Sequence, residues 1–144
     1  MIKRSPVKVA IASGKGGAGK TLLATNLWAC LSKKRGVLLV DLDSEEPNCA
    51  LFAGGFPDAT YLQYKMIPEW EKDKCTLCGN CVVNCKLHAI VKAAETIHVL
   101  NKLCHSCYAC SELCPENSLP MKEWLLGEIN EYVSADIKLV ESRL

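Results

Sequence analysis

Two runs of four cysteines constrain the fold of this chain more than any other feature. Both runs have the spacing C-x2-C-x2-C-x3-C, and the second begins 29 residues after the first. They consist of Cys75, Cys78, Cys81 and Cys85, and of Cys104, Cys107, Cys110 and Cys114. In such a run three closely spaced thiolates wrap one corner of a cubane cluster, while the fourth cysteine points away and reaches a second cluster.

The spacing therefore predicts two 4Fe-4S clusters, each with a set of four ligands. The first set is Cys75, Cys78, Cys81 and Cys114, and the second is Cys104, Cys107, Cys110 and Cys85. Zinc is the alternative, because paired CxxC motifs commonly bind it, but zinc sites need two pairs with a spacer and not two evenly filled rows of four. We interpret His88, His98 and His105 as non-ligands, because eight cysteines already satisfy two clusters.

Composition limits the environment and the partners. The 144 residues are 49% hydrophobic and 23% charged, as in soluble globular proteins. A net charge of +1 provides no field that gathers nucleic acid, which is therefore not a favoured partner. No apolar stretch is long enough for a membrane span or a signal peptide, so we expect a cytoplasmic protein in which metal ligation is favoured over disulfides. Cys30 and Cys49, outside the runs, are expected to be buried.

Residues 70–119 resemble the two-cluster bacterial ferredoxins through both cysteine runs and through Pro115, which follows the second run. The chain departs from that pattern at Lys86, where the family often has proline. Proline there shapes a turn and supplies no ligand, so the departure leaves the clusters in place. The resemblance implies a carrier of single electrons at low potential.

A second motif lies before the cysteines, where residues 14–21 match the phosphate-binding pattern GxxxxGKT. Its members are Gly14, Lys15, Gly16, Gly17, Ala18, Gly19, Lys20 and Thr21. Apolar residues 7–12 predict a strand before the motif, and helical spacing predicts a helix from Lys20 to a stop at Gly36. Residues 37–40 predict a second strand that ends in Asp41, so residues 7–41 are expected to form a βαβ unit with parallel strands.

This motif is expected to bind the phosphates of a nucleotide together with Mg2+. Glycines let successive backbone N–H groups turn toward the phosphates, and the helix N-terminus adds its positive end. Lys20 is expected to reach the β and γ phosphates, and the Thr21 hydroxyl to ligate Mg2+.

The string KGGAGKT resembles the deviant Walker A motif of the MinD, ParA and nitrogenase iron protein superfamily. That resemblance implies that the chain binds ATP in a sandwich homodimer, in which Lys15 reaches the nucleotide of the partner subunit. Asp41-Leu42-Asp43 resembles the DxD segment of the same superfamily, which implies that Asp43 orients the attacking water and that Asp41 supports Mg2+ through its shell. With the cysteine segment, the chain resembles MinD-superfamily ATPases that carry an inserted ferredoxin domain.

The predicted class is α/β: an incomplete parallel sheet of a P-loop NTPase with an inserted α+β ferredoxin-like domain. We expect the P-loop domain in residues 1–67, the insertion in 68–120 and a return to the P-loop domain in 121–144. In the insertion each cysteine loop should precede a short helix, and residues 90–99 should form a hairpin. Residues 54–74 and those from Pro120 onward are interpreted as connections.

The P-loop domain has too few residues for the about five strands of a doubly wound sheet. No later apolar strand ends in Asp, and Asp136 is too weakly flanked to serve as a Walker B residue. We therefore expect an N-terminal fragment, or a sheet that a second polypeptide completes, with an exposed apolar face and little hydrolysis without switch II.

Three functions are compatible with these motifs. The leading hypothesis is an ATPase whose nucleotide cycle controls electron flow through the two clusters to a redox partner protein. The second is a carrier that delivers iron-sulfur clusters to apo acceptor proteins under the control of ATP. The third is a plain electron carrier with a vestigial P-loop, against which the intact Lys20, Thr21 and Asp43 argue.

Overall fold

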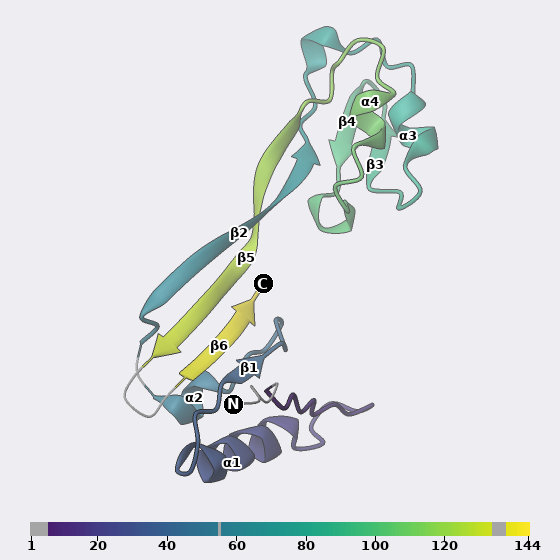
Figure 1. Cartoon of the computed structure of the whole chain (residues 1–144). Coiled ribbons are helices and arrows are strands. Elements are labelled where there is room, and N and C mark those ends of the chain that lie inside the picture. The colour runs from purple at the N-terminus through teal and green to yellow at the C-terminus, as the bar shows by residue number, and fades with distance from the viewer. Residues whose placement is uncertain (1–5, 55, 134–137) are drawn as a thin grey trace. The chain divides into compact units, whose positions relative to one another are not determined.

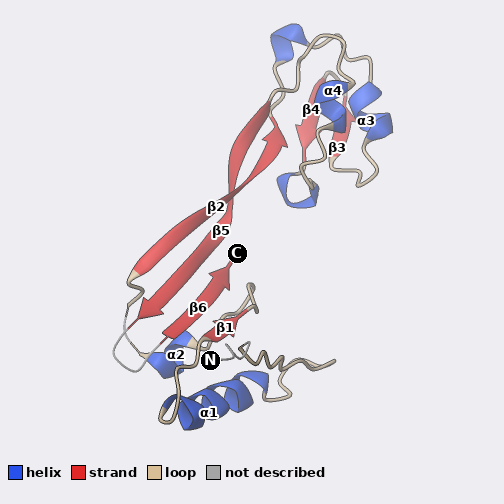
Figure 2. Ribbon diagram, in the orientation of Figure 1, coloured by secondary structure: helices blue, strands red, loops and turns tan. Residues whose placement is uncertain are grey.

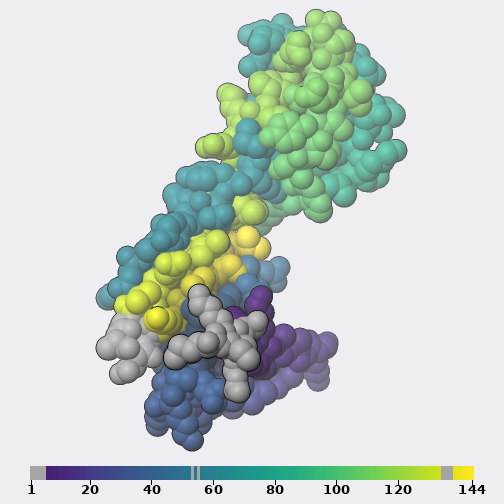
Figure 3. All heavy atoms as spheres, viewed as in Figure 1, coloured from purple at the N-terminus to yellow at the C-terminus, as the bar shows by residue number. Residues whose placement is uncertain are grey.

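The computed structural model describes residues 6–54, 56–133 and 138–144, and the chain divides into two units. Unit one comprises Met1–Tyr61 and Gly127–Leu144, and unit two comprises Leu62–Leu126. In sequence, unit two is therefore inserted into unit one. The teal and green residues of unit two form one continuous mass in Figure 3.

The glycine-rich loop of unit one leads into helix α1, Lys20–Ser32, which confirms the predicted helix. Gly19 caps α1 with a φ of 83°, a left-handed conformation that glycine adopts without steric cost. The helix buries Thr25 and Trp28. Cys30 was expected to be buried but is exposed, because it lies off the helix face that carries these two residues.

A mixed sheet contains the strands of unit one, and two of its strands cross the unit boundary and continue into unit two. It contains β1 (Leu39–Asp41), β6 (Lys138–Arg143), β5 (Met121–Val133) and β2 (Ala59–Pro68), in that order (Figure 1). Strand β1 pairs in parallel with β6, which pairs antiparallel with β5. The predicted α/β class is confirmed, but the sheet is mixed and not purely parallel.

The core of unit one lies where the short helix α2, Ala50–Ala53, packs on β6. Cys49, Tyr132 and Leu139 form its buried cluster, which confirms the predicted burial of Cys49. Glu141 is also fully buried, and its Oε1 atom accepts a hydrogen bond of 2.9 Å from the hydroxyl of Tyr132. This hydrogen bond offsets part of the cost of removing a polar group from water.

The strand predicted for residues 7–12 does not form. These residues have no regular structure in Figure 2, and Val7 and Val9 are 87% and 68% exposed. A strand is stable only beside a neighbour that pairs with its backbone groups, and the parallel neighbour of β1 is β6. The predicted βαβ pairing across residues 7–41 was therefore wrong.

Two segments interpreted as connections are largely strands, so that interpretation was also wrong. Strand β2 occupies much of residues 54–74, and β5 and β6 follow Pro120. The prolines at positions 57 and 68 suggested a loop, but they flank a run rich in β-branched and aromatic residues that pairs with β5. Asp136, which we judged too weakly flanked for a Walker B role, lies outside the described residues.

Unit two combines an antiparallel hairpin with short helices. The hairpin consists of β3 (Ile90–Ala93) and β4 (Thr96–Val99), and the helices are α3 (Asn80–Asn84) and α4 (Ala109–Glu112). Single 3-10 turns, Lys72–Lys74 and Asn101–Leu103, precede the two cysteine loops. The predicted hairpin and the predicted helix after each loop are confirmed.

Unit two is packed around a core to which the cysteines themselves contribute. Its buried residues are Cys81, Cys110, Ile90, Ile97 and Leu119. Each half of the repeat thus places its third cysteine in the same core, so that the two loops are held by one set of apolar contacts.

The expected apolar surface is present in unit one. Leu22, Leu23 and Leu27 on α1 are exposed, as are Leu38 and Val40 in and beside β1. Among the residues that the structure describes, no helix has the length and apolar character that crossing a membrane requires.

The end of β6 leaves no room for a side chain at Gly127. A Cβ atom at this position would lie 2.1 Å from the carbonyl oxygen of Arg143, which is backbone and has little freedom to move. We predict that Gly127→Ala lowers the free energy of unfolding by about 1–3 kcal/mol, as overpacking does. Urea denaturation measures the change.

Gly36→Ala is the matched control for this substitution. A Cβ atom at Gly36 meets nothing within 4 Å, so the added methyl group has open space. We expect a change within about 0.5 kcal/mol for this variant. Equal effects of the two substitutions would contradict the close packing at Gly127.

Candidate functional site

The glycine-rich loop of unit one presents its backbone to solvent at the start of α1. Residues 14–19 are exposed, and a Cβ atom built on Gly14, Gly16, Gly17 or Gly19 meets nothing within 4 Å. Gly17 and Gly19 have φ angles of 72° and 83°, which L side chains rarely adopt. Open space above the N-terminus of a helix fits a phosphate group, because the first N–H groups of the helix lack partners there.

The two lysines of the motif differ in their surroundings. Lys15 is exposed within the loop, whereas Lys20, the first residue of α1, is half-buried, as is the neighbouring Thr21. Lys20 and Thr21 thus lie at the helix end where the pattern requires them. Lys15 lies outside the helix, where it is free to extend from the chain.

Asp41 organises the loop that follows β1. Its carboxylate accepts backbone hydrogen bonds from Asp43 at 3.1 Å, Asn48 at 3.2 Å and Cys49 at 3.0 Å. The side chain of Asp41 is nearly buried, with the residue 9% exposed, whereas Asp43 is exposed. Asp41 therefore has a structural role in this loop, and the roles predicted for both aspartates toward Mg2+ and water stay predictions.

These contacts shift the pKa values of Asp41 and Cys49. Burial alone raises the pKa of Asp41, but hydrogen bonds from Asp43, Cys49 and Asn48 outweigh it and hold the pKa below the ordinary value of 3.8. Burial, together with the neighbouring Asp41 and Glu141, raises the pKa of Cys49 to about 12. Cys49 therefore stays a thiol at neutral pH.

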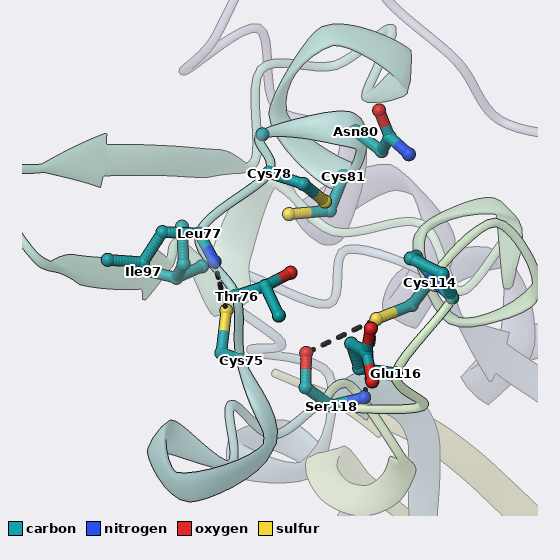
Figure 4. A pocket seen from close by; sticks show the side chains of 12 residues that line it. Cys75, Thr76, Leu77, Cys78, Asn80, Cys81, Ile97, Cys114, Glu116 and Ser118 are labelled. Carbon is teal, nitrogen blue, oxygen red and sulfur yellow. Dashed lines mark hydrogen bonds between the residues drawn. The ribbon is translucent and has the colours of Figure 1, made fainter.

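The first pocket of interest in unit two is lined by four cysteines from both runs (Figure 4). Cys75, Cys78 and Cys81 come from the first run, and Cys114 comes from the end of the second. These are the four residues that the spacing assigns to the first cluster. The charge of Cys75 contributes to the pKa of Cys114 by raising it.

Hydrogen-bond donors surround the sulfurs of this pocket. Burial raises the pKa of Cys75, but the indole N–H of Trp70, the backbone N–H of Leu77 and the Ser118 hydroxyl outweigh it and lower the pKa. Likewise, burial raises the pKa of Cys114, while the hydroxyl and N–H of Ser118 lower it further than burial raises it. Both sulfurs thus lose their protons more easily than an ordinary cysteine does, and the thiolate is the form that ligates iron.

The structure gives fewer contacts for the second set of cysteines than for the first. Burial raises the pKa of Cys110 to about 11, and the charges of Cys104 and Cys107 raise it too. Cys85 lies at the end of α3, which packs against α4. Its sulfur accepts a hydrogen bond of 3.2 Å from the N–H of Ala89.

The backbone repeats with the same offset of 29 residues as the cysteines. Left-handed φ angles occur at Leu77 and Ser106, at Gly79 and Tyr108, and at His88 and Asn117. Such angles are uncommon for residues other than glycine, so their pairwise recurrence is a property of the repeat. Tyr108 adopts, at a cost in strain, a conformation for which the first half uses glycine.

The pocket residues fit a cubane cluster. The indole Nε1 of Trp70 is buried close to Cys75, but it makes no hydrogen bond of ordinary geometry to any described protein atom. A sulfur of a bound cluster would provide that acceptor. No group of three or more His, Cys, Asp or Glu side chains in the described ranges is close enough to hold a single metal ion, for which zinc would need sulfurs within about 4 Å of one another.

Sequence reasoning missed three residues near the cysteines, namely Trp70, Ser118 and Lys65. Ser118 follows Cys114 by four residues, as Ala89 follows Cys85, so an alignment of the two halves would have drawn attention to the difference. Trp70 and Lys65 lie outside the repeated spacing of the cysteines. Neither the cysteine runs nor the glycine-rich motif points to them.

Lys65 ties the second cysteine loop to β2. Its Nζ atom donates hydrogen bonds to the carbonyl oxygens of Asn101 at 2.7 Å and Cys104 at 2.9 Å. The same ammonium group lies 5.0 Å from the centroid of the Trp124 ring, a distance that suits a cation–π interaction. Lys65 therefore holds the backbone at the start of the second run.

Asp41→Asn is predicted to loosen the loop after β1 in a pH-dependent way. Because the pKa of Asp41 is lower in the folded chain, its contribution is present above about pH 4 and is lost as the pH falls through the folded value. At pH 7 we expect the loop to open more easily by about 2 kcal/mol, a typical value for hydrogen bonds to a charged group. Hydrogen exchange of residues 43–49 measures the difference.

Glu45→Gln serves as the control, because Glu45 is an exposed carboxylate in the same loop. Exchange in this variant should match the wild type at every pH. A gap between Asp41→Asn and wild type that persists unchanged after the pH has fallen below the folded pKa of Asp41 would show that the carboxylate charge does not organise the loop.

Lys65→Met is predicted to free the start of the second cysteine run. It removes two charge-assisted hydrogen bonds, which should lower the local stability of residues 101–107 by about 2 kcal/mol. Faster amide exchange in this segment is the readout. Lys122→Met is the control, because Lys122 pairs with Glu69 at the exposed surface, where an ion pair contributes about 0–1 kcal/mol. Equal exchange in both variants would refute the role of Lys65.

Several known proteins are similar to this chain. An uncharacterised protein of Methanocaldococcus jannaschii is 37% identical over 86 residues, which are 58% of this chain and 30% of that protein. A second uncharacterised protein of the same organism is 29% identical over 126 residues, which are 85% of this chain and 44% of that protein. The iron-sulfur cluster carrier protein of Pyrococcus horikoshii is 36% identical over 73 residues, which are 46% of this chain and 25% of that protein.

The chain thus spans less than half the length of each of these relatives. A family model for the CobQ/CobB/MinD/ParA nucleotide binding domain matches residues 9–139. This range begins before the glycine-rich loop, includes both cysteine runs and ends within β6. The match covers most of the sequence, and the chain therefore belongs to the CobQ/CobB/MinD/ParA nucleotide-binding family.

Proposed function

We propose that this chain is part of an ATP-binding iron-sulfur protein in which the nucleotide controls electron transfer through two 4Fe-4S clusters. The observation that carries the proposal is the pocket in which Cys75, Cys78 and Cys81 meet Cys114. A ligand set shared between two runs is the arrangement expected of a two-cluster protein. The exposed phosphate loop on the same chain supplies the nucleotide part of the proposal.

The proposed division follows the sequence. Residues 1–67 and 121–144 belong to the nucleotide-binding part, and residues 68–120 form the two-cluster insertion. Cys104, Cys107, Cys110 and Cys85 complete the second cluster. When bound, each cluster accepts and releases one electron at a time.

In the nucleotide site the residues act by binding and orientation. The N–H groups of residues 14–19 and the N-terminus of α1 hold the phosphates, and Lys20 neutralises charge on their β and γ oxygens. The Thr21 hydroxyl and the loop organised by Asp41 position Mg2+, and Asp43 orients water. Lys15 extends toward a nucleotide bound by a second copy, so the complete protein works as a homodimer.

A cluster carrier is the second candidate. The iron-sulfur cluster carrier proteins of Pyrococcus horikoshii and Pyrococcus abyssi are 36% and 37% identical to this chain over 73 residues. Cys78 and Cys107 are also exposed, which would give an acceptor thiolate access to each cluster. For the leading proposal the partner is a redox protein, and for this one it is an apo acceptor; a cytoplasmic location suits both.

Anaerobic reconstitution with iron and sulfide tests the first half of the proposal. We expect about eight irons per chain and, after reduction, the EPR signals of two interacting clusters. Zinc, or a single cluster, would contradict it. Loss of the clusters to an apo acceptor, faster with MgATP than without, would favour the carrier function.

Redox titration of the same sample with MgATP, with MgADP and without nucleotide tests the second half. We predict that MgATP shifts the potential of at least one cluster. Lys20→Ala should weaken MgATP binding about tenfold or more and remove the shift, since a charge-assisted contact to phosphate is worth about 1.5–3 kcal/mol. Lys34→Ala, which changes an exposed lysine after α1, should keep it. If the cluster potentials are the same with and without nucleotide in every sample, the result would favour a plain electron carrier.

A further inference from the structure

The internal repeat of unit two allows the surroundings of the two clusters to be compared residue by residue. Residues 29 positions apart occupy equivalent places, as the paired cysteines and left-handed φ angles establish. Ser118 is therefore equivalent to Ala89, and Trp70 is equivalent to Val99. In both pairs the residue beside the first ligand set has a side-chain donor, and its counterpart has none.

Ser118 is placed to donate a hydrogen bond to a ligating sulfur. The residue is only 2% exposed, and its Oγ atom lies 3.2 Å from Sγ of Cys114. Figure 4 marks this contact with a dashed line. A thiolate that ligates iron has no proton to give, so the hydroxyl must be the donor in the cluster-bound state. The backbone N–H of Ser118 donates to the same sulfur at 3.3 Å.

Ala89 preserves only half of this arrangement. Its N–H donates to Sγ of Cys85 at 3.2 Å, which matches the backbone hydrogen bond of Ser118. Ala89 is also 2% exposed, so its methyl group occupies an equally buried position. The two sites thus share the N–H···S bond and differ by one hydroxyl group.

Trp70 adds a second donor on the same side. Its indole N–H is buried without an acceptor among the described protein atoms, and Trp70 packs against the same core cluster as Cys75. Val99, its counterpart, packs against the apolar core and has no donor. Each loop also has one lysine that donates to a backbone carbonyl, Lys92 to that of Leu77 and Lys65 to that of Cys104.

We propose that Ser118, together with Trp70, raises the reduction potential of the cluster held by Cys75, Cys78, Cys81 and Cys114, and so makes the two clusters inequivalent. Reduction adds negative charge to the cluster and its sulfur ligands. Hydrogen bonds to those sulfurs stabilise the reduced state more than the oxidised one. This inference deepens the proposed function and rests on its two-cluster part, but not on its nucleotide part.

The test uses reciprocal substitutions in the reconstituted chain. Ser118→Ala removes the extra hydroxyl, and Ala89→Ser introduces one at the equivalent place beside the second cluster. Redox titration followed by EPR gives both potentials. The shifted proton signals of the cysteine β-methylene groups assign each potential to its ligand set.

We expect Ser118→Ala to lower the potential of the first cluster alone, with a three- to tenfold change in its equilibrium between reduced and oxidised forms. At 59 mV per tenfold for one electron, this change is about 28–59 mV. Ala89→Ser should raise the potential of the second cluster alone by a comparable amount. Trp70→Phe should act in the same direction as Ser118→Ala.

The result that overturns the inference is a Ser118→Ala chain with about eight irons in which the first potential is unchanged, or in which both potentials move together. A sample that holds fewer than two clusters would contradict both this inference and the proposed function. Two clusters that respond to Ser118→Ala but not to nucleotide would sustain the inference and reject only nucleotide control. ENDOR in H2O and D2O provides a further readout, because one exchangeable proton near the first cluster, that of the Ser118 hydroxyl, should disappear in Ser118→Ala while those of the N–H groups remain.

Discussion

The organisation of unit two depends on one contact, in which thiols from two separated cysteine runs meet around a single pocket. This pocket is lined by Cys75, Cys78 and Cys81 of the first run and by Cys114 of the second. Such a meeting requires the halves of the repeat to pack against each other, and Cys81 and Cys110 lie in one buried core. The hairpin of β3 and β4 then links the halves over a short distance in the chain. The meeting of the two cysteine runs and the hydrophobic packing thus stabilise the same arrangement.

Unit one depends on a different kind of contact, hydrogen bonds to buried carboxylates. Asp41 bonds three backbone N–H groups after β1, and its register partner on β6 is the buried Glu141, which accepts a hydrogen bond from Tyr132. These contacts fix the loop next to the sheet, while the glycine-rich loop before α1 is left open for a ligand. Only β2 and β5 continue from unit one into unit two, so they are the covalent links between the two parts.

Local patterns in the sequence predicted what short-range physics decides. The helix after the glycine loop, the hairpin and the short helices after the cysteine loops follow from spacing and from turn residues. The strand at residues 7–12 was wrong because its formation depends on a neighbouring strand, which no local pattern supplies. Strand β2 was missed because flanking prolines dominated the interpretation. Trp70 and Lys65 reach the cysteine loops only through tertiary packing, whereas Ser118 was visible in a comparison of the two halves.

The central claim is that the two runs exchange their fourth cysteines, and Mössbauer and EPR spectra of single-cysteine variants test it most directly. Serine should be introduced separately at Cys75, Cys104 and Cys114, and each chain reconstituted under the same conditions. The account predicts that Cys114→Ser and Cys75→Ser perturb the same cluster, and that Cys104→Ser perturbs the other. If Cys114→Ser instead perturbs the cluster that Cys104→Ser perturbs, each run binds its own cluster and the account is wrong.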